Sequence, residues 1–443
     1  MDRKLLNVLS LSFYLMILFS AQYAVLNMQK TIISSIHDEK PEFTVEGFFV
    51  TGIMYTVFSI SVWLAPSLIC VLGPRLSMAI ANIGYIGYLA AFNMEKAWSM
   101  YAGAVVVGIS EALLWTSQGN YLFLNSEPNT VNRNLGIFWV IFSSAELYGN
   151  MYVYFKLEGK KYIDAETRKI VIYSMTSVAA ASLLMFGLLG KAKESFSSDA
   201  KPKKESPGQA LKTTWTIFNT TKMRMLCISF AFIGMHQAFR CGIYSSSVGF
   251  TLKIGDNSKQ LVVLSGVFIG TGELLGGLFQ ITLSGFTERR KYGKCVVLGT
   301  GLVCQLITFT IICLNIPATA VFGNTLDESF IHPRASLAML CSILIGFSDC
   351  CCHTQMYSIM AVMFPENSSQ TCAIYKFTKG IMVAVTFYCS SYLNLHQQLA
   401  VLAPMALIAN LTFFKVNKTV MEAAEQAKND YNLEKIKYDL SNS

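Results

Sequence analysis

Long apolar stretches separated by short polar segments dominate the pattern of this chain. Twelve such runs, most of them about 20 residues long, contain few or no charged side chains. A helix of that length crosses a bilayer and satisfies its own backbone hydrogen bonds there. We therefore expect an all-α polytopic membrane protein with twelve transmembrane helices. The predicted helices cover residues 5–26, 48–72, 76–92, 97–124, 135–155, 170–189, 223–251, 261–283, 295–316, 335–364, 371–393 and 399–414.

A polar segment near the middle of the chain divides these runs into six and six. Residues 191–222 are rich in Lys, Ser and Pro and show no hydrophobic period, so they predict a flexible cytoplasmic connection. We expect one six-helix half over 1–190, a second over 223–416, and a cytoplasmic tail over 417–443. Two six-helix halves that meet at a midplane cavity are typical of the major facilitator fold.

Composition and charge support a membrane assignment. Hydrophobic residues make up 53% of the chain and charged residues only 14%, against about 25% charged residues in soluble domains. With the N-terminus in the cytoplasm, most lysines and arginines fall in cytoplasmic segments, as the positive-inside rule requires. Both termini are therefore expected to be cytoplasmic. Basic loops facing an anionic leaflet account for the net charge of +8, so the charge implies a lipid bilayer and no nucleic-acid partner.

Ionisable side chains inside the predicted helices are the first candidates for a functional site. Each costs about 2.5–3.5 kcal/mol on membrane-insertion scales, so such groups mark cavities or ion pairs. Seven fall at this depth, and they are Glu111, Glu146, Arg240, Glu273, Asp349, Lys376 and Lys379.

Arg240 lies near the middle of its run, and Glu273 and Asp349 are its natural counter-ions on neighbouring helices. Arg240 either binds an anionic group or a titrating carboxylate in a cavity, or forms a fixed structural salt bridge. If Arg240 is buried mid-membrane, Glu273 or Asp349 should lie within hydrogen-bonding reach, whereas an Arg240 far from both acids would indicate an anion-binding arginine. Asp349 and His353 are four residues apart and share a helical face. They either relay protons or only hydrogen-bond to neighbouring helices.

The predicted helix over 97–124 carries a second set of candidates. Trp115, Gln118 and Asn120 follow Glu111 and could stack on and hydrogen-bond to a polar solute; the alternative is helix packing. Lys376 either contacts a solute or extends its long side chain to the membrane interface.

Sequence motifs of common enzymes are absent from the chain. It has no GxxxxGK[ST] phosphate loop, no HExxH, no paired CxxC motifs at zinc spacing and no GxSxG elbow. We therefore expect no enzymatic activity, no cofactor and no metal site.

Five stretches of the chain contain distinctive motifs. They are ALLWTSQG at 112–119, NLGIFW at 134–139, GVFIGTGELLGG at 266–277, GFSDCCCHTQ at 346–355 and IYKF at 374–377. Together they resemble the uncoordinated-93-like family of the major facilitator superfamily. The resemblance implies a twelve-helix facilitator fold without enzymatic activity, and relatives include an accessory subunit of potassium channels and a chaperone of endosomal receptors. It implies two functions. One is a secondary transporter, an orphan solute carrier, that binds a small polar or charged solute at the midplane. The other is a non-transporting accessory or trafficking subunit of another membrane protein, such as a potassium channel.

Overall fold

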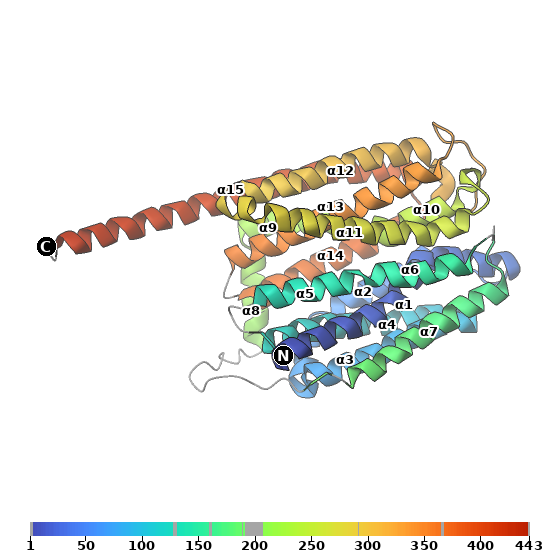
Figure 1. The fold of residues 1–443 in the computed structure, drawn as a ribbon, viewed down its shortest axis with the longest axis horizontal. Helices are drawn as coiled ribbons and strands as arrows, with labels where there is room; N and C mark the ends of the chain where they lie inside the picture. The colour runs from blue at the N-terminus through green and yellow to red at the C-terminus, as the bar shows by residue number, and fades with distance from the viewer. Residues whose placement is uncertain are drawn as a thin grey trace.

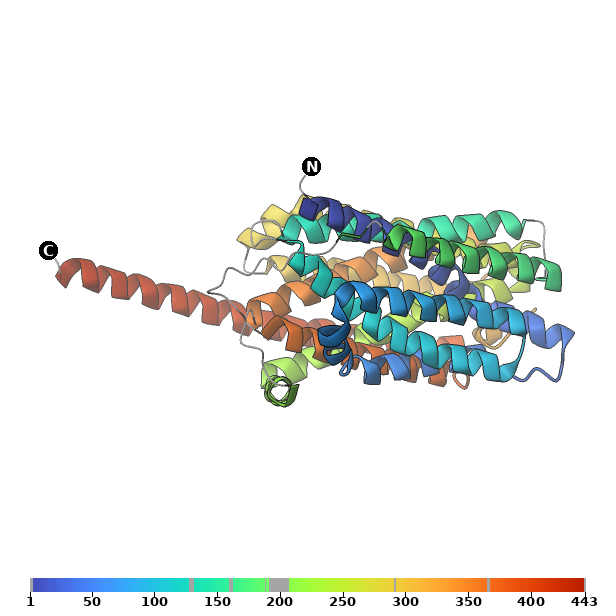
Figure 2. The ribbon, with the colours of Figure 1, turned by 90° about the horizontal axis from the view of Figure 1, so that it is seen from below.

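The computed structural model describes residues 3–126, 131–158, 162–187, 189–190, 207–290, 292–364 and 367–441. These residues are mainly helical, and most of the helices run side by side in one elongated bundle (Figure 1). Both ends of the chain lie toward the same end of the bundle in two perpendicular views (Figures 1 and 2).

Helices before the central connection pack mainly on one another, and we call them the first group. They are α1 (Arg3–Glu39), α2 (Gly47–Ser61), α3 (Ala65–Ala91), η1 (Phe92–Met94), α4 (Ala97–Leu124), α5 (Val131–Ser143), α6 (Ala145–Lys156) and α7 (Ala165–Phe186).

Helices after the connection form the second group in the same way. They are α9 (Thr221–Ala238), η2 (Phe239–Ile243), α10 (Tyr244–Phe250), η3 (Leu252–Ile254), α11 (Ser258–Arg289), α12 (Gly293–Asn315), η4 (Ala318–Val321), α13 (Ala335–Met363), α14 (Ser368–Ser390) and α15 (Leu395–Ser441). The end of α15 extends beyond the bundle, where the sequence predicts a polar tail over 417–443 (Figure 1).

Nine helices in the described part of the chain are long and apolar enough to cross a membrane. The chain is therefore an integral, multi-pass membrane protein. The other three predicted runs correspond to α2, to α5 with α6, and to α14. Helix α2 is short because the helix is interrupted after Ser61, α5 and α6 are separated at Ser144, and α14 carries Lys376 and Lys379.

The turn between the second and third predicted runs depends on a single glycine. Gly73 has φ 77° and ψ 157°, and helical structure resumes at Pro74. Because an L side chain is strained at this φ, glycine is required here.

The prediction of a flexible connection is wrong for its second part. Residues 191–206 lie outside the described residues, but Pro207–Phe218 form helix α8. Pro207 suits the first helical turn, and Thr214 and Ile217 are buried as α8 packs on α14. This contact with α14 orders the helix, and the sequence alone does not reveal it. α8 lies across the direction of the bundle and is seen nearly end-on in Figure 2.

The two groups meet where α2 packs against α14 and α6 packs against α11. At the end of the bundle opposite α8, Ser391 Oγ donates a hydrogen bond to Glu46 Oε2 at 2.8 Å. In the contact between α6 and α11, Gln260 Nε2 donates to the Tyr154 carbonyl at 3.2 Å. These contacts hold the groups together at that end.

Candidate functional site

Arg240 lies in η2, a single π-helical turn that joins α9 to α10. Such a turn adds one residue to the helix and occurs often at functional sites. The guanidinium is buried, with 8% of the side chain exposed. A buried charge requires partners of opposite charge.

Three carboxylates from three helices surround this guanidinium. Arg240 Nη1 lies 2.9 Å from Glu273 Oε1 on α11 and 3.3 Å from Glu146 Oε2 on α6. Arg240 Nε lies 3.7 Å from Asp349 Oδ2 on α13. The predicted pairing of Arg240 with Glu273 or Asp349 is confirmed. Because Glu146 belongs to the first group, the cluster also links the two groups.

Two histidines extend this charged cluster around Asp349. His236 Nδ1 lies 3.2 Å from Asp349 Oδ1, and His353 Nε2 lies 3.7 Å from Asp349 Oδ2. The other ring nitrogen of His353 is 2.6 Å from the Tyr375 hydroxyl of α14. His353 thus lies between the Asp349 carboxylate of α13 and the Tyr375 hydroxyl of α14.

The side chains of the cluster are not all fully buried. The side chains of Glu273 and His353 keep 16% and 21% of their surface accessible. Some buried polar atoms in the described residues also lack a hydrogen-bond partner, among them His236 Nε2 and Gln237 Oε1. Buried polar atoms are usually hydrogen-bonded, so these atoms leave bonding capacity for a ligand.

Trp115 connects the candidates on α4 to the second group. Its ring stacks on Trp139 at a centroid distance of 6.2 Å and contacts Phe142 edge-on at 5.3 Å. Lys376 Nζ of α14 donates to the Trp115 carbonyl at 3.5 Å. Glu111, one turn earlier on α4, is half-buried.

The predicted residues therefore divide into those that the structure brings together and those that it does not. Arg240, Glu273, Asp349 and His353 form one cluster, and Lys376 reaches Trp115. Gln118 is buried on α4, whereas Asn120 is exposed toward the end of that helix.

His236 and Tyr375 belong to the cluster although they are missing from the predicted site residues, and Glu146 belongs to it although the sequence analysis gave it no partner. The burial cost of a carboxylate at bilayer depth marks Glu146, but the sequence contains no signal that pairs it with Arg240. His236 lies one turn before Arg240, and that spacing is a usable signal. Tyr375 has no comparable signal.

A glycine allows the two helices that carry Glu146 and Glu273 to approach closely. A Cβ added to Gly270 would lie 3.1 Å from Glu146 Cβ, so this glycine lets α11 approach α6.

In the described part of the chain, no group of three or more His, Cys, Asp and Glu side chains is arranged to hold a metal ion.

Comparison with known sequences identifies the family of this chain. Residues 43–414 match the family described as "Ion channel regulatory protein UNC-93". UNC93-like protein MFSD11 of Xenopus laevis is 34% identical over 434 residues, which cover 94% of this chain and 96% of the relative. Protein unc-93 homolog A of Bos taurus is 24% identical and covers 96% of both chains.

Solved structures with a similar fold include transporters. The peptide transporter POT in complex with sulfate has a TM-score of 0.68 at 10% identity and covers 94% of this chain and 95% of its own. The nucleoside transporter NupG has a TM-score of 0.61 at 14% identity, with 92% and 99% covered. The fold is therefore transporter-like.

Proposed function

Because this chain belongs to the UNC-93 family and has a transporter-like fold, we propose that it is a secondary transporter. The two groups of helices act as its two halves. A small polar or charged solute binds between them, at the cluster around Arg240. Glu111 and Trp115 line the side of this site that faces the first group, and Lys376 lines the other side.

One observation carries this proposal, the ion pair between Arg240 and Glu146. Transporters of this fold alternate by rocking one half against the other around a midplane site. An ion pair that joins the halves at that site must break or exchange partners during such a movement. Glu273 and Asp349 lie within 2.9 and 3.7 Å of Arg240, so the guanidinium keeps a partner when it leaves Glu146.

The charges of the site favour a particular kind of solute. The ionisable groups at membrane depth include four acids, Glu111, Glu146, Glu273 and Asp349, and three bases, Arg240, Lys376 and Lys379. With all seven groups ionised and the histidines neutral, one negative charge is left over. A solute with a positively charged group, or a proton bound together with the solute, balances it.

Uptake into vesicles tests transport. The purified chain in phosphatidylcholine vesicles is assayed with labelled nucleosides, dipeptides, amino acids, amines and carboxylic acids, with and without a pH gradient. We expect saturable uptake of at least one class, and its loss in Arg240→Gln. Lys253→Gln is the control, because Lys253 pairs with Glu328 at an exposed position. Uptake that Arg240→Gln leaves unchanged would refute the site.

The topology that goes with this function has twelve crossings and cytoplasmic termini. α2 with the start of α3, α5 with α6, and α14 supply the three crossings beyond the nine long apolar helices. The shared position of both chain ends supports an even number of crossings (Figures 1 and 2). Protease protection of tags at the two ends in sealed vesicles checks this topology.

A second function, accessory subunit of another membrane protein, is favoured by the description of the matching family as an ion channel regulatory protein. Affinity purification in mild detergent distinguishes the two. A stoichiometric membrane partner, such as a potassium channel, supports this function. A lone monomer with saturable solute uptake excludes it.

A further inference from the structure

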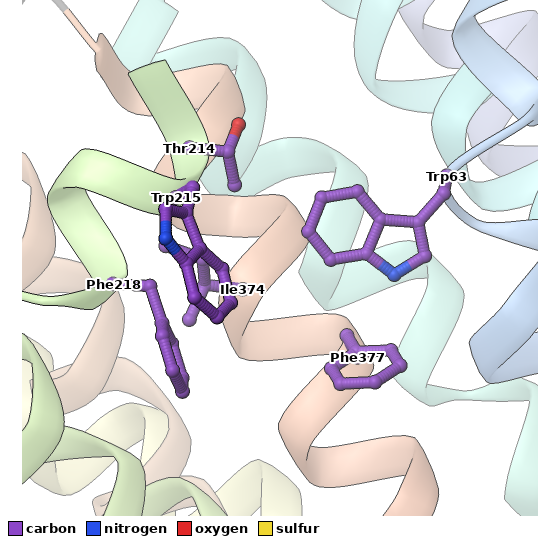
Figure 3. A pocket seen from close by; sticks show the side chains of 6 residues that line it. All are labelled: Trp63, Thr214, Trp215, Phe218, Ile374 and Phe377. Carbon is purple, nitrogen blue, oxygen red and sulfur yellow. The ribbon is translucent and has the colours of Figure 1, made fainter. Parts of the chain in front are cut away.

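An apolar cavity of about 400 Å³ lies beside α8. Its volume falls in the range of about 300–1,000 Å³ that is usual for ligand pockets. The residues that line it are Trp63, Thr214, Trp215, Phe218, Ile374 and Phe377 (Figure 3). None of them belongs to the charged cluster.

Three parts of the chain build this α8 cavity. Trp63 comes from the break between α2 and α3, Ile374 and Phe377 come from α14, and the others come from α8. In Figure 3 the Trp63 ring lies across the open space from Trp215, with Phe377 below it. Trp63 and Phe377 contact each other edge-on at a centroid distance of 5.6 Å. The cavity therefore lies between the two groups of helices.

The lining predicts an apolar ligand that enters from the side of α8. Four aromatic rings and Ile374 supply nearly all of the wall, and no charged residue lines it. Trp215 is 66% exposed and forms the outer edge. A charged group inside the cavity would lose its hydration and find no side chain of opposite charge there.

The position of α8 indicates where such a ligand comes from. α8 lies across the bundle at the end where both chain termini are found (Figures 1 and 2). Amphipathic helices in this orientation lie in the interface of a membrane, and tryptophans are enriched at that depth. Lys212 precedes the lining residues of α8, and Lys222 and Arg224 follow them closely. Lys212 and Arg224 are exposed.

We propose that the α8 cavity binds one acyl chain of an anionic phospholipid, whose head group lies at Lys212, Lys222 and Arg224. The acyl chain packs against the apolar wall of the cavity, and the basic residues attract the phosphate and the anionic head group. Since Trp63 belongs to the first group and Phe377 to α14, the bound chain contacts both groups at this end. This site is independent of the solute site.

Native mass spectrometry of the full chain in detergent tests the proposal with dioleoyl phosphatidylserine. Thr214→Phe fills the cavity. Its matched control is Thr216→Phe, the same change two residues along α8 at an exposed position. We expect one lipid bound to the wild type and to Thr216→Phe. In Thr214→Phe the affinity for the lipid should fall by at least about tenfold. Equal binding by all three proteins would overturn the acyl-chain site, as would a wild type without bound lipid.

A second pair of variants avoids any folding defect caused by Thr214→Phe. Trp215→Ser removes the outer edge of the cavity, and Trp98→Ser removes a similarly exposed tryptophan elsewhere, at 61% exposure. Only Trp215→Ser should lose lipid. Soluble glycerophosphoserine, which has no acyl chain, should not compete. Competition by it, or equal binding of dioleoyl phosphatidylcholine, would contradict the proposed mode of recognition.

Discussion

Arg240 of the second group of helices lies 3.3 Å from Glu146 of the first, and both side chains are buried. Each would be costly alone at this depth. The pair lies where α6 packs closely on α11, because a Cβ added to Gly270 would lie only 3.1 Å from Glu146 Cβ. The charged cluster and the contact between the groups are therefore one structural feature.

Replacing Arg240 by leucine should lower stability strongly. The change leaves Glu146, Glu273 and Asp349 close together without their shared cation, and removing one partner of a buried pair costs about 3–5 kcal/mol. Folded yield and melting temperature in detergent measure the effect. Lys253→Leu is the control, since the exposed pair with Glu328 contributes only about 0–1 kcal/mol.

Neutralising an acid together with Arg240 should restore part of that loss, because removing both partners of a buried pair is far less costly. Arg240→Leu combined with Glu273→Leu is the first combination to measure, because these side chains are 2.9 Å apart. A double variant no more stable than Arg240→Leu would show that Glu273 is not the main partner.

Gly346→Ala should destabilise the packing of α13 on α11. The added Cβ would lie 1.9 Å from the Ile269 carbonyl oxygen, so the two backbones must separate. Overpacking of this kind costs about 1–3 kcal/mol. Gly277→Ala on α11 is the control, since nothing lies within 4 Å of its Cβ position. Equal melting temperatures for the two variants would count against the close approach of α11 and α13.

Glu95 should make the stability of the protein change with pH in the acidic range. It lies beyond η1, where Lys40 and Arg168 pair with its carboxylate. Burial raises the pKa of Glu95, but hydrogen bonds and positive charge from Lys40 and Arg168 outweigh it and leave the pKa below its ordinary value. Such a group adds stability that is complete above the unfolded pKa of about 4.3 and is lost as the pH falls through the lower folded pKa.

Glu95→Gln should accordingly lower the melting temperature at neutral pH, and its curve should converge with that of the wild type in acid. Glu328→Gln, at a position that is 89% exposed, should follow the wild type throughout. A constant difference between Glu95→Gln and the wild type down to the lowest pH would disprove this assignment.

The sequence predicts the membrane-spanning character well because hydropathy adds up over about 20 residues. It does not predict where a helix is interrupted, since that depends on single positions. Ser144 separates α5 from α6, and Gly73 alone makes a turn that the pattern shows only as a gap between runs. α8 was missed because its few apolar positions stand in a polar connecting segment, and the contacts with α14 that bury them are not visible in the sequence.

The candidate site was predictable only within one group of helices. The cost of a buried arginine requires an acid nearby, and Glu273 is that acid. Glu146 was not paired with Arg240, because the contact depends on how α6 packs against α11. No local pattern along the chain encodes the rotation of two helices against each other.

The central claim is that the Arg240 cluster binds a solute between the two groups of helices. Thermal stabilisation by added solutes tests this claim most directly. The purified wild type, Glu146→Gln, Asp349→Asn and Glu328→Gln are screened with the same solute classes at acidic, neutral and basic pH, each against its own ligand-free melting temperature. The account predicts a solute that stabilises the wild type and Glu328→Gln alike, with affinity at least about tenfold weaker in Glu146→Gln and Asp349→Asn. Stabilisation by that solute of equal size in all four proteins would contradict it.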